Sequence, residues 1–308
     1  MKFERAAIVA IAVVMSAPTL AIAEDDELEF EEAFVFFELN DTDGDLGIHG
    51  KVDGDAWKKV AIEGPNDRKI MDVKAKSGLR YQGLTEMFFE SAEPTFDELD
   101  PDVFFNRFPE GAYEWEGLTL DDEEIEGEVF LSHVIPAAPV VATVGGSDEN
   151  PGFEEDDGEV EKVCWEDVER TADGGVLIEW EPVEQSHFDK WSNGAEPLEN
   201  EGDKIPLGVS GDVEVVYYEF VAEIDDTEYK MTALIPDDVN QWTVPAEFIE
   251  MAETLDVEGE PVEEIKFEII VRVETGDFED DDGEEVESTL GNQSAVEDCF
   301  VIVEEDED

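Results

Sequence analysis

The chain has 308 residues, of which 87 are acidic and 18 basic, and its formal net charge is −69. Because 41% of the residues are apolar and 10% aromatic, the chain can bury a core, which excludes a wholly disordered protein despite the charge. Nucleic acid is excluded as a partner, since phosphate binding requires patches of Lys and Arg and we expect none. Anionic membranes are excluded because they carry charge of the same sign as the chain. Divalent cations, basic proteins and neutral polymers remain as possible partners.

The first residues have the form of a secretory signal peptide. Lys2 and Arg5 precede an apolar segment at residues 6–15, and a small-residue cleavage site ends at Ala23. The apolar run is too short for a membrane anchor, and no later segment is apolar enough to span a bilayer. We therefore expect removal of residues 1–23 and export to a periplasm or the extracellular space. An exported protein meets environmental salt directly, so the acidity indicates a marine or halophilic source.

Residues 24–136 are predicted to form an N-terminal β-sandwich domain. Alternating apolar residues indicate a hairpin whose loop lies near residues 40–47. Further strands are expected at residues 57–63, 69–75 and 84–90, and a second hairpin at 110–117 and 128–135. A short helical insert is expected near residues 95–108, because Thr95 opens a capping box and Asp100 precedes a proline.

The loop of the first hairpin carries the strongest chemical motif of the chain. Asp41, Asp43 and Asp45 alternate with small residues, a pattern that can wrap carboxylate oxygens around Ca²⁺, and Asp53 is expected to add a ligand from the opposite strand. The motif resembles the acidic half of an EF-hand loop but lacks its final glutamate. Asp and Gly are also the residues that hairpin turns use, so an acidic turn stays open as the alternative. His49, on the polar face nearby, is a further candidate ligand.

An acidic linker is predicted at residues 137–159, with a short strand at 140–144 inside it. Beyond it, residues 160–304 alternate apolar and charged residues in several segments, as in antiparallel strands with one face buried. Residues 305–308 form an acidic tail. The predicted fold class is therefore all-β, with two antiparallel β-sandwich domains.

The second domain resembles fibronectin type III. The segment at residues 176–183, with Trp180 followed by a proline, is similar to strand B, and residues 215–220 are similar to the strand with the core tyrosine. Residues 266–273 resemble strand F and residues 291–296 the approach to strand G. An insert at about residues 184–212 departs from the pattern, so a general immunoglobulin-like sandwich remains open.

The chain has two cysteines, Cys164 and Cys299. In an oxidising compartment they can pair, and two buried thiols are the alternative. The fibronectin type III resemblance implies a disulfide, because it places Cys164 in the strand A region beside the strand G that holds Cys299.

No catalytic motif with a nucleophile, a phosphate-binding loop or paired metal-binding histidines is present in the sequence. We therefore predict a non-catalytic binding, adhesion or envelope-associated protein with an unidentified protein or glycan partner. Ligand contact is expected from the 184–212 insert, through Phe188 and Trp191. Two alternatives remain: a calcium-binding protein that uses the Asp41–Asp45 loop, and a secreted polysaccharide hydrolase that uses paired carboxylates.

Overall fold

The computed structural model describes residues 28–65, 67–156, 159–187, 213–257, 259–274, 278–279, 285–286 and 290–302. The predicted signal peptide, the ligand-contact candidates Phe188 and Trp191, and the predicted acidic tail lie outside these residues. Within them, no helix has the length and apolar character needed to cross a membrane.

The N-terminal sandwich consists of strands β1 to β7 and two short helices. In chain order these are β1 (Leu28–Glu29), β2 (Glu32–Asn40), β3 (Asp45–Gly64), β4 (Arg68–Lys74), α1 (Gly78–Gln82), β5 (Leu84–Glu90), α2 (Pro101–Arg107), β6 (Gly111–Thr119) and β7 (Glu124–Leu131). Both predicted hairpins are present, as β2–β3 and β6–β7.

Strand β3 builds both layers of this sandwich. Its first half pairs with β2 and β5, and its second half pairs with β6 and β4. The register shifts between Asp53 and Trp57, where the strand passes from one layer to the other. The strand predicted at residues 57–63 is therefore the second half of a longer one. Trp57 and Trp115 are fully buried in the core between the layers.

The helical insert is present in part. Helix α2 begins after Asp100, whose side chain accepts a hydrogen bond from the Asp102 amide, and Pro101 occupies its first turn as expected. Residues 95–98 form only a turn, in which the Glu98 and Leu99 amides donate to the Thr95 carbonyl. Helices α1 and α3 (Ala246–Ala252) were not predicted from the sequence.

The C-terminal sandwich places two sheets face to face. Its strands are β8 (Val140–Val144), β11 (Val176–Glu181), β12 (Val215–Ile224), β13 (Lys230–Pro236), β14 (Gln241–Val244), β17 (Glu264–Glu274) and β20 (Leu290–Val301). Three separate two-stranded ribbons are formed by β9 (Phe153–Asp156) with β10 (Glu159–Lys162), β15 (Asp256–Val257) with β16 (Glu260–Pro261), and β18 (Phe278–Glu279) with β19 (Glu285–Val286). One sheet has the order β14-β11-β8 and the other contains β20-β17-β12-β13. The strand that resembles strand B thus lies opposite the sheet that holds the strands similar to F and G, as in immunoglobulin-like sandwiches.

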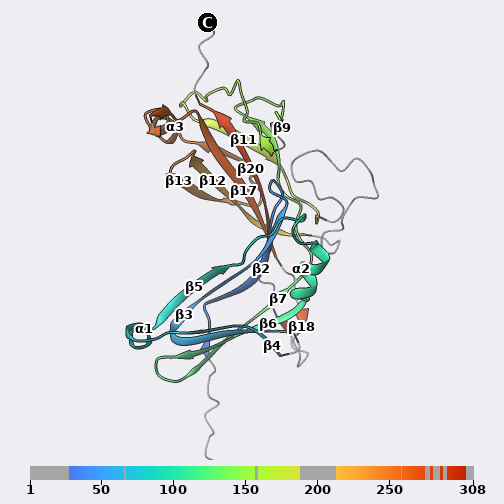
Figure 1. Cartoon of the computed structure of the whole chain (residues 1–308), viewed down its shortest axis with the longest axis vertical. Helices are drawn as coiled ribbons and strands as arrows, with labels where there is room; N and C mark the ends of the chain where they lie inside the picture. The colour runs from blue at the N-terminus through green and yellow to red at the C-terminus, as the bar shows by residue number, and fades with distance from the viewer. Residues whose placement is uncertain are drawn as a thin grey trace, which may run out of the picture.

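A single sheet runs through both sandwiches. The parallel pairing of β2 with β20 joins the two parts, so that the strand order is β1-β7-β6-β3-β2-β20-β17-β12-β13. Figure 1 shows the two parts arranged along the long axis and meeting where β2 and β20 lie side by side. Each part keeps its own hydrophobic core. The predicted all-β fold with two sandwiches is confirmed, and the predicted strand at 140–144 is β8.

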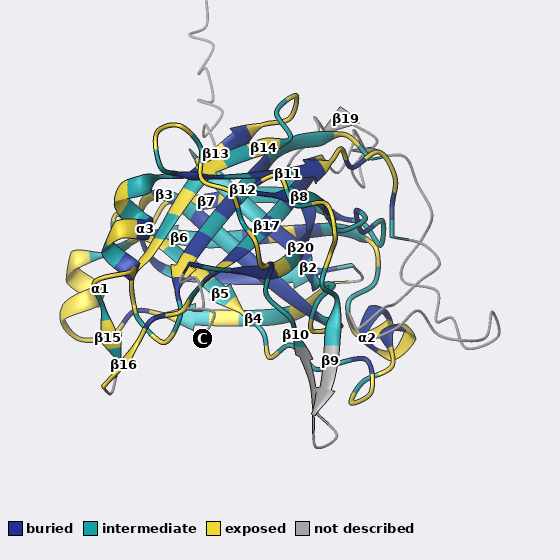
Figure 2. Cartoon of the chain, turned by 90° about the horizontal axis from the view of Figure 1, so that it is seen from above, coloured by how far each residue is buried: buried dark blue, intermediate teal, exposed yellow. Residues whose placement is uncertain are grey.

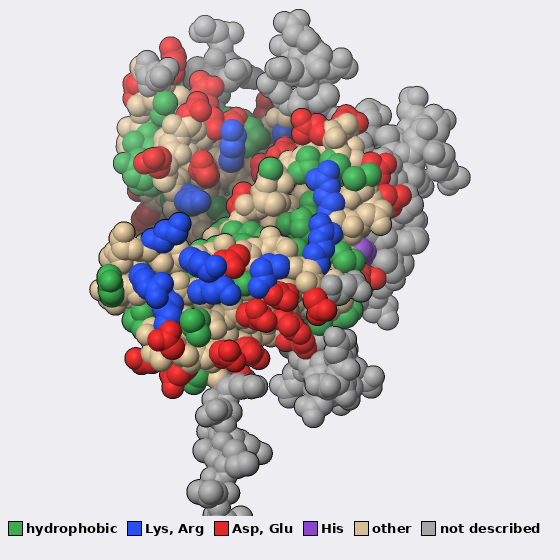
Figure 3. Space-filling model, turned by 60° about the horizontal axis from the view of Figure 1, so that its bottom comes forward, with side chains coloured by type: hydrophobic (Ala, Val, Ile, Leu, Met, Phe, Trp, Pro, Cys, Tyr) green, Lys and Arg blue, Asp and Glu red, His purple; other side chains and the backbone are tan. Residues whose placement is uncertain are grey.

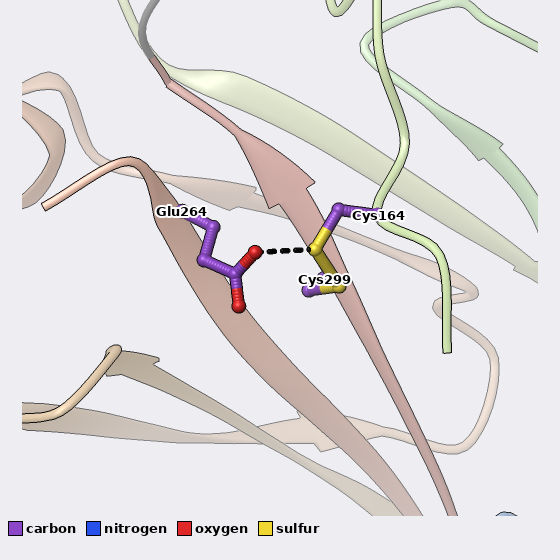
Figure 4. Close-up of side chains that lie close together, drawn as sticks. All are labelled: Cys164, Glu264 and Cys299. Atoms are coloured by element: carbon purple, nitrogen blue, oxygen red, sulfur yellow. Dashed lines mark hydrogen bonds between the residues drawn. A yellow bond between two sulfur atoms is a disulfide. The ribbon is translucent and has the colours of Figure 1, made fainter. Parts of the chain in front are cut away.

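The predicted disulfide is present. Cys164 and Cys299 are bonded, with their Cα atoms 4.6 Å apart (Figure 4). The neighbouring residue Trp165 pairs with β20 through its backbone, and its indole Nε1 donates to Asp298. Glu264 from β17 lies against the bond, with its Oε2 atom 2.9 Å from the Cys164 sulfur. Burial raises the pKa of Glu264, which favours the protonated carboxyl that can donate to this sulfur.

Removal of the disulfide should destabilise the protein strongly. The bond closes a loop of 135 residues, and in the chain-entropy model a loop of this length contributes about 4–5 kcal/mol to the free energy of unfolding. We expect the Cys164→Ala/Cys299→Ala variant to lose roughly this amount in a denaturant titration. Protein unfolded without a reductant should expose no free thiol, and two thiols in that assay would contradict the bond.

Candidate functional site

The turn that contains the predicted metal motif is organised by hydrogen bonds within the chain. Asn40 Oδ1 accepts from the backbone amides of Thr42 (3.0 Å) and Asp43 (3.3 Å), which is the Asx-turn arrangement. Gly44 closes the turn with a positive φ of 65° and donates from its amide to the Asn40 carbonyl. The sequence alternative of an acidic hairpin turn therefore describes the local backbone.

The same turn is fixed to β20 of the C-terminal sandwich. The Thr42 hydroxyl donates to the Glu297 carbonyl (3.2 Å) and accepts from the Glu297 amide (2.8 Å). Asn40 Nδ2 donates to the Glu297 carboxylate (2.7 Å), and the Asp41 amide donates to the Ala295 carbonyl (3.0 Å). The turn thus belongs to the joint between the two sandwiches, by which we mean the β2–β20 pair and the side chains around it.

The four predicted metal ligands do not come together. The Asp41 carboxylate lies 3.0 Å from Nε2 of His187. The backbone of Asp45 lies opposite Asn40, where β2 and β3 meet the turn. In the β2–β3 register, the backbone of Asp53 lies opposite Glu32, at the other end of the hairpin. Asp53 lies eight residues beyond Asp45 along the extended strand β3, a distance of roughly 26 Å. Asp53 therefore cannot share an ion with the turn, and the expectation that it returns to the loop is wrong.

A buried amide holds the joint together. Asn292 of β20 is only 2% exposed. Its Oδ1 accepts from the Phe37 amide of β2, and its Nδ2 donates to the carbonyls of Ser132 and Val134, each at 2.8 Å. Ser294 adds a hydrogen bond to the Pro136 carbonyl (2.6 Å). All hydrogen-bonding capacity of the Asn292 side-chain N–H groups is thereby used, which ties both sandwiches and their connection to one side chain.

The outer face of the sheet is also covered at the joint. Gln293 hydrogen-bonds to Glu38 of β2 and to Arg272 of β17. The Arg272 guanidinium lies 3.6 Å from the ring centre of Phe36, a cation–π contact across the two sandwiches. Burial lowers the pKa of Arg272, and the neighbouring Glu38 opposes that shift. Charged and aromatic groups thus pack as a second small interface above the sheet.

A histidine between two carboxylates lies in this layer. His49 of β3 is 4% exposed; its Nε2 is 2.8 Å from Glu93 Oε1, and its Nδ1 is 3.5 Å from Glu38 Oε2. Gly47 makes room for the Glu93 carboxylate, because a Cβ there would lie 2.2 Å from its oxygen. One atom from each of Glu38, His49 and Glu93 lies within 4.8 Å of the others, a spacing at which the three can hold a metal ion. Among the described residues, no group of this kind includes Asp41, Asp43, Asp45 or Asp53.

Like charges accumulate around the joint. Burial, and then Glu93 and Asp43, raise the pKa of Asp45 to about 7. Burial, and then Glu297 and Glu38, raise the pKa of Glu268 to about 8. The pKa values of Glu38 and Glu297 are also raised, with burial as the main cause. Near neutral pH the joint therefore binds protons that exposed carboxylates would release, or it can accept another cation in their place.

A second feature is an open groove on the C-terminal sandwich, about 560 Å³ in volume. It is lined by Ala142, Thr143, Glu179, Trp180, Asp238, Val239, Asn240 and Gln241. The Thr143 hydroxyl donates to the Glu179 carboxylate (2.8 Å). The groove holds two carboxylates, but the Trp180 ring packs into the core against Tyr218 and cannot serve as a platform for a sugar.

The basic residues are not evenly spread. Residues 51–80 contain eight basic and five acidic residues, a net charge of +3 in a chain of −69. Figure 3 shows Lys and Arg side chains gathered on one face of the N-terminal part. The expectation that the chain has no patch of Lys and Arg is therefore wrong. The signal was present in the sequence as a local excess that the overall charge concealed.

No protein-family model and no curated protein matches the chain. Among solved structures, it is similar to the FN1–FN3 domains of chicken CNTN1, with 6% identity, 86% of this chain and 68% of that chain covered, and a TM-score of 0.24. It is also similar to the BSP domain of a biofilm associated protein, with 11% identity, 87% and 30% coverage, and a TM-score of 0.20.

A third similar structure concerns host cell surface retention of a 1.5-MDa bacterial ice-binding adhesin, with 10% identity, 89% and 64% coverage, and a TM-score of 0.21. The chain thus spans less than a third of the biofilm protein structure and about two thirds of the adhesin structure. None of these TM-scores reaches 0.5, so the likenesses carry no argument about function.

Truncation of Asn292 should loosen the joint. The Asn292→Ala variant leaves one buried amide and two carbonyls without partners, and we expect a loss of about 2–4 kcal/mol in the free energy of unfolding. The exposed Asn106, whose Nδ2 donates to the Asp102 carbonyl, provides the control, and Asn106→Ala should change the free energy by less than about 0.5 kcal/mol. Equal losses in the two variants would contradict the role of Asn292.

Protonation of Glu268 should make stability depend on pH. Its pKa in the folded protein, about 8, exceeds the ordinary value of 4.5, so the folded state binds the proton more tightly. The free energy of unfolding should therefore fall as the pH rises from the ordinary pKa of 4.5 to the folded-state pKa of about 8. Glu268→Gln should stabilise the protein by at least about 1 kcal/mol above pH ~8 and have little effect near pH ~4.5. Glu223→Gln, an exposed carboxylate on β12, controls for the general relief of repulsion, and an equal gain there would refute the specific effect.

Proposed function

We propose that this protein is an exported, non-catalytic binding protein associated with the cell envelope. The observation that supports the proposal most is the joint, where β2 pairs with β20 and Asn292 connects three backbone segments. A hinge between two catalytic lobes would need this contact to open, whereas a rigid two-part platform needs it closed. The two sandwiches then present loops and sheet faces at a fixed spacing, as a binding protein requires.

Two further features support export. The Cys164–Cys299 disulfide suits an oxidising compartment, and the first 23 residues have the pattern of a cleaved signal. We propose the fibronectin type III class for the C-terminal sandwich, on the strand motifs that the sequence displays. The 184–212 insert with Phe188 and Trp191 stays a proposed contact region; residues 188–212 of it lie outside the described residues.

The binding function is tested by sedimentation of the mature protein with an insoluble envelope fraction of its source. We expect saturable binding that is lost after thermal unfolding of the protein. The polymers of the envelope fraction should be recovered unchanged. Release of soluble sugars during the incubation would contradict a non-catalytic role and favour the hydrolase alternative, with Glu179 and Asp238 of the groove as the first carboxylates to replace. Absence of saturable binding would refute envelope association.

A second candidate function is the binding of a divalent cation at the joint. The cluster of Glu38, His49 and Glu93 supports it, with Asp45 adding negative charge nearby. A buried imidazole beside carboxylates suits Zn²⁺ or Mn²⁺ better than Ca²⁺, which takes oxygen ligands. The candidate site therefore moves from the turn predicted from the sequence to the layer beside it.

This candidate predicts that Zn²⁺ or Mn²⁺ raises the melting temperature of the metal-free protein by mass action. Glu93→Gln should remove the increase, because the variant lacks one carboxylate ligand. The fold should tolerate this change, since Glu93 is partly exposed and Gln keeps the shape of the side chain. Asp53→Asn, at the far end of the hairpin, should leave the increase intact. If only Ca²⁺ raises the melting temperature, and Asp43→Asn abolishes that increase, the metal site lies in the turn and not at Glu38, His49 and Glu93.

A further inference from the structure

Helix α1 buries no side chain at all. Leu79 is 52% exposed and Tyr81 84% exposed, and the burial colouring of Figure 2 shows the helix almost wholly exposed at the edge of the molecule. Ser77 and Gly83, at its two ends, both have positive φ, so the chain turns sharply into and out of the helix. Burial in the core therefore does not account for the large apolar residues of this segment. We call residues 76–82 the α1 tip.

Cationic side chains surround these apolar groups. Lys76 and Arg80 belong to the α1 tip and are exposed, and Lys74 at the end of β4 pairs in register with Lys59 of β3. Two acids lie close: Asp72 is 3.4 Å from Lys74, and Asp122 of the β6–β7 turn pairs with the buried Lys58. The pKa of Asp122 is lowered by Lys58, with Arg80 contributing. Each of these acids thus has a lysine partner, whereas Lys76 and Arg80 form no close ion pair with any residue that the structure describes.

We propose that the α1 tip docks on an anionic lipid surface, as the contact that gives the envelope association proposed above. Charge complementarity favours an anionic partner, because the tip is cationic where the rest of the chain is acidic. The tip is convex and carries an aliphatic and an amphipathic aromatic side chain, which suits the headgroup boundary of a bilayer. A rigid polyanion gives Leu79 nothing to bury against, so a lipid surface fits better than a soluble polysaccharide or nucleic acid.

The net charge does not prevent this contact at moderate salt. The tip lies at the end of the N-terminal part that is farthest from the joint (Figure 1). At physiological ionic strength the Debye length is about 8 Å, so a lipid surface senses the tip more than the remaining acid. At about 0.01 M salt the Debye length is about 30 Å and the whole acidic surface repels the membrane, whereas molar salt screens the tip itself. Binding should therefore be strongest at intermediate salt.

The test is co-sedimentation of the mature protein with phosphatidylcholine vesicles that contain phosphatidylglycerol, and with vesicles of phosphatidylcholine alone. We expect binding to the anionic vesicles only, with a maximum at intermediate salt. Lys76→Gln/Arg80→Gln and Leu79→Ser/Tyr81→Ser should each weaken it about tenfold or more. Because the α1 tip buries no side chain, both variants should keep the melting temperature of the parent protein.

Matched controls come from β13, where Lys230 is exposed and Leu234 is 67% exposed. Lys230→Gln and Leu234→Ser should bind as the parent does, and equal weakening in these variants would overturn the proposal. Equal binding to neutral vesicles would do so as well, and so would a tip-dependent preference for a soluble sulfated polysaccharide. If vesicle binding fails while the envelope fraction is still bound, the lipid assignment is wrong and the binding function stands. Failure of both refutes both.

Discussion

The pairing of β2 with β20 is the contact on which the rest of the molecule depends. Two sandwiches with separate cores would ordinarily be connected by a flexible segment, and the acid on each would drive them apart. The parallel ladder of backbone hydrogen bonds and the three hydrogen bonds of Asn292 join uncharged groups, so salt screens them far less than it screens ion pairs. Hydrogen bonds between uncharged groups therefore join the two halves beside the carboxylates that gather at the joint.

The carboxylates at the joint show the electrostatic consequence of that choice. Glu38, Asp45, Glu268 and Glu297 come from both halves, and burial together with their neighbours raises the pKa of each. Arg272 is the cation that faces them, and the His49 imidazole lies beside Glu38. A group of acids held close by a rigid contact lowers its energy by taking up protons or a metal ion. The same constraint thus underlies the pH dependence and the cation candidate.

The sequence predicted what local patterns determine. Alternation of apolar residues located the hairpins, the proline after Asp100 located α2, and the fibronectin type III resemblance paired Cys164 with Cys299. Two kinds of feature escaped it. The β2–β20 ladder joins residues more than 250 positions apart, and no local signal marks such a pair. The Asp loop fits both a metal motif and an acidic turn, because turns and calcium sites use the same residues, and the docking of Thr42 on Glu297 is a structural role that no local pattern marks.

The net charge misled for a related reason, because an average over the chain conceals its distribution. A partner in moderate salt interacts with the side chains within about one Debye length, not with the total charge. Residues 51–80 carry a positive balance, and α1 adds apolar side chains that no described part of the chain buries. Strong acidity elsewhere makes this local exception more selective, since the net charge of −69 repels an anionic surface. On the proposal made above, the acid elsewhere on the molecule leaves the α1 tip as the favoured point of contact with an anionic surface.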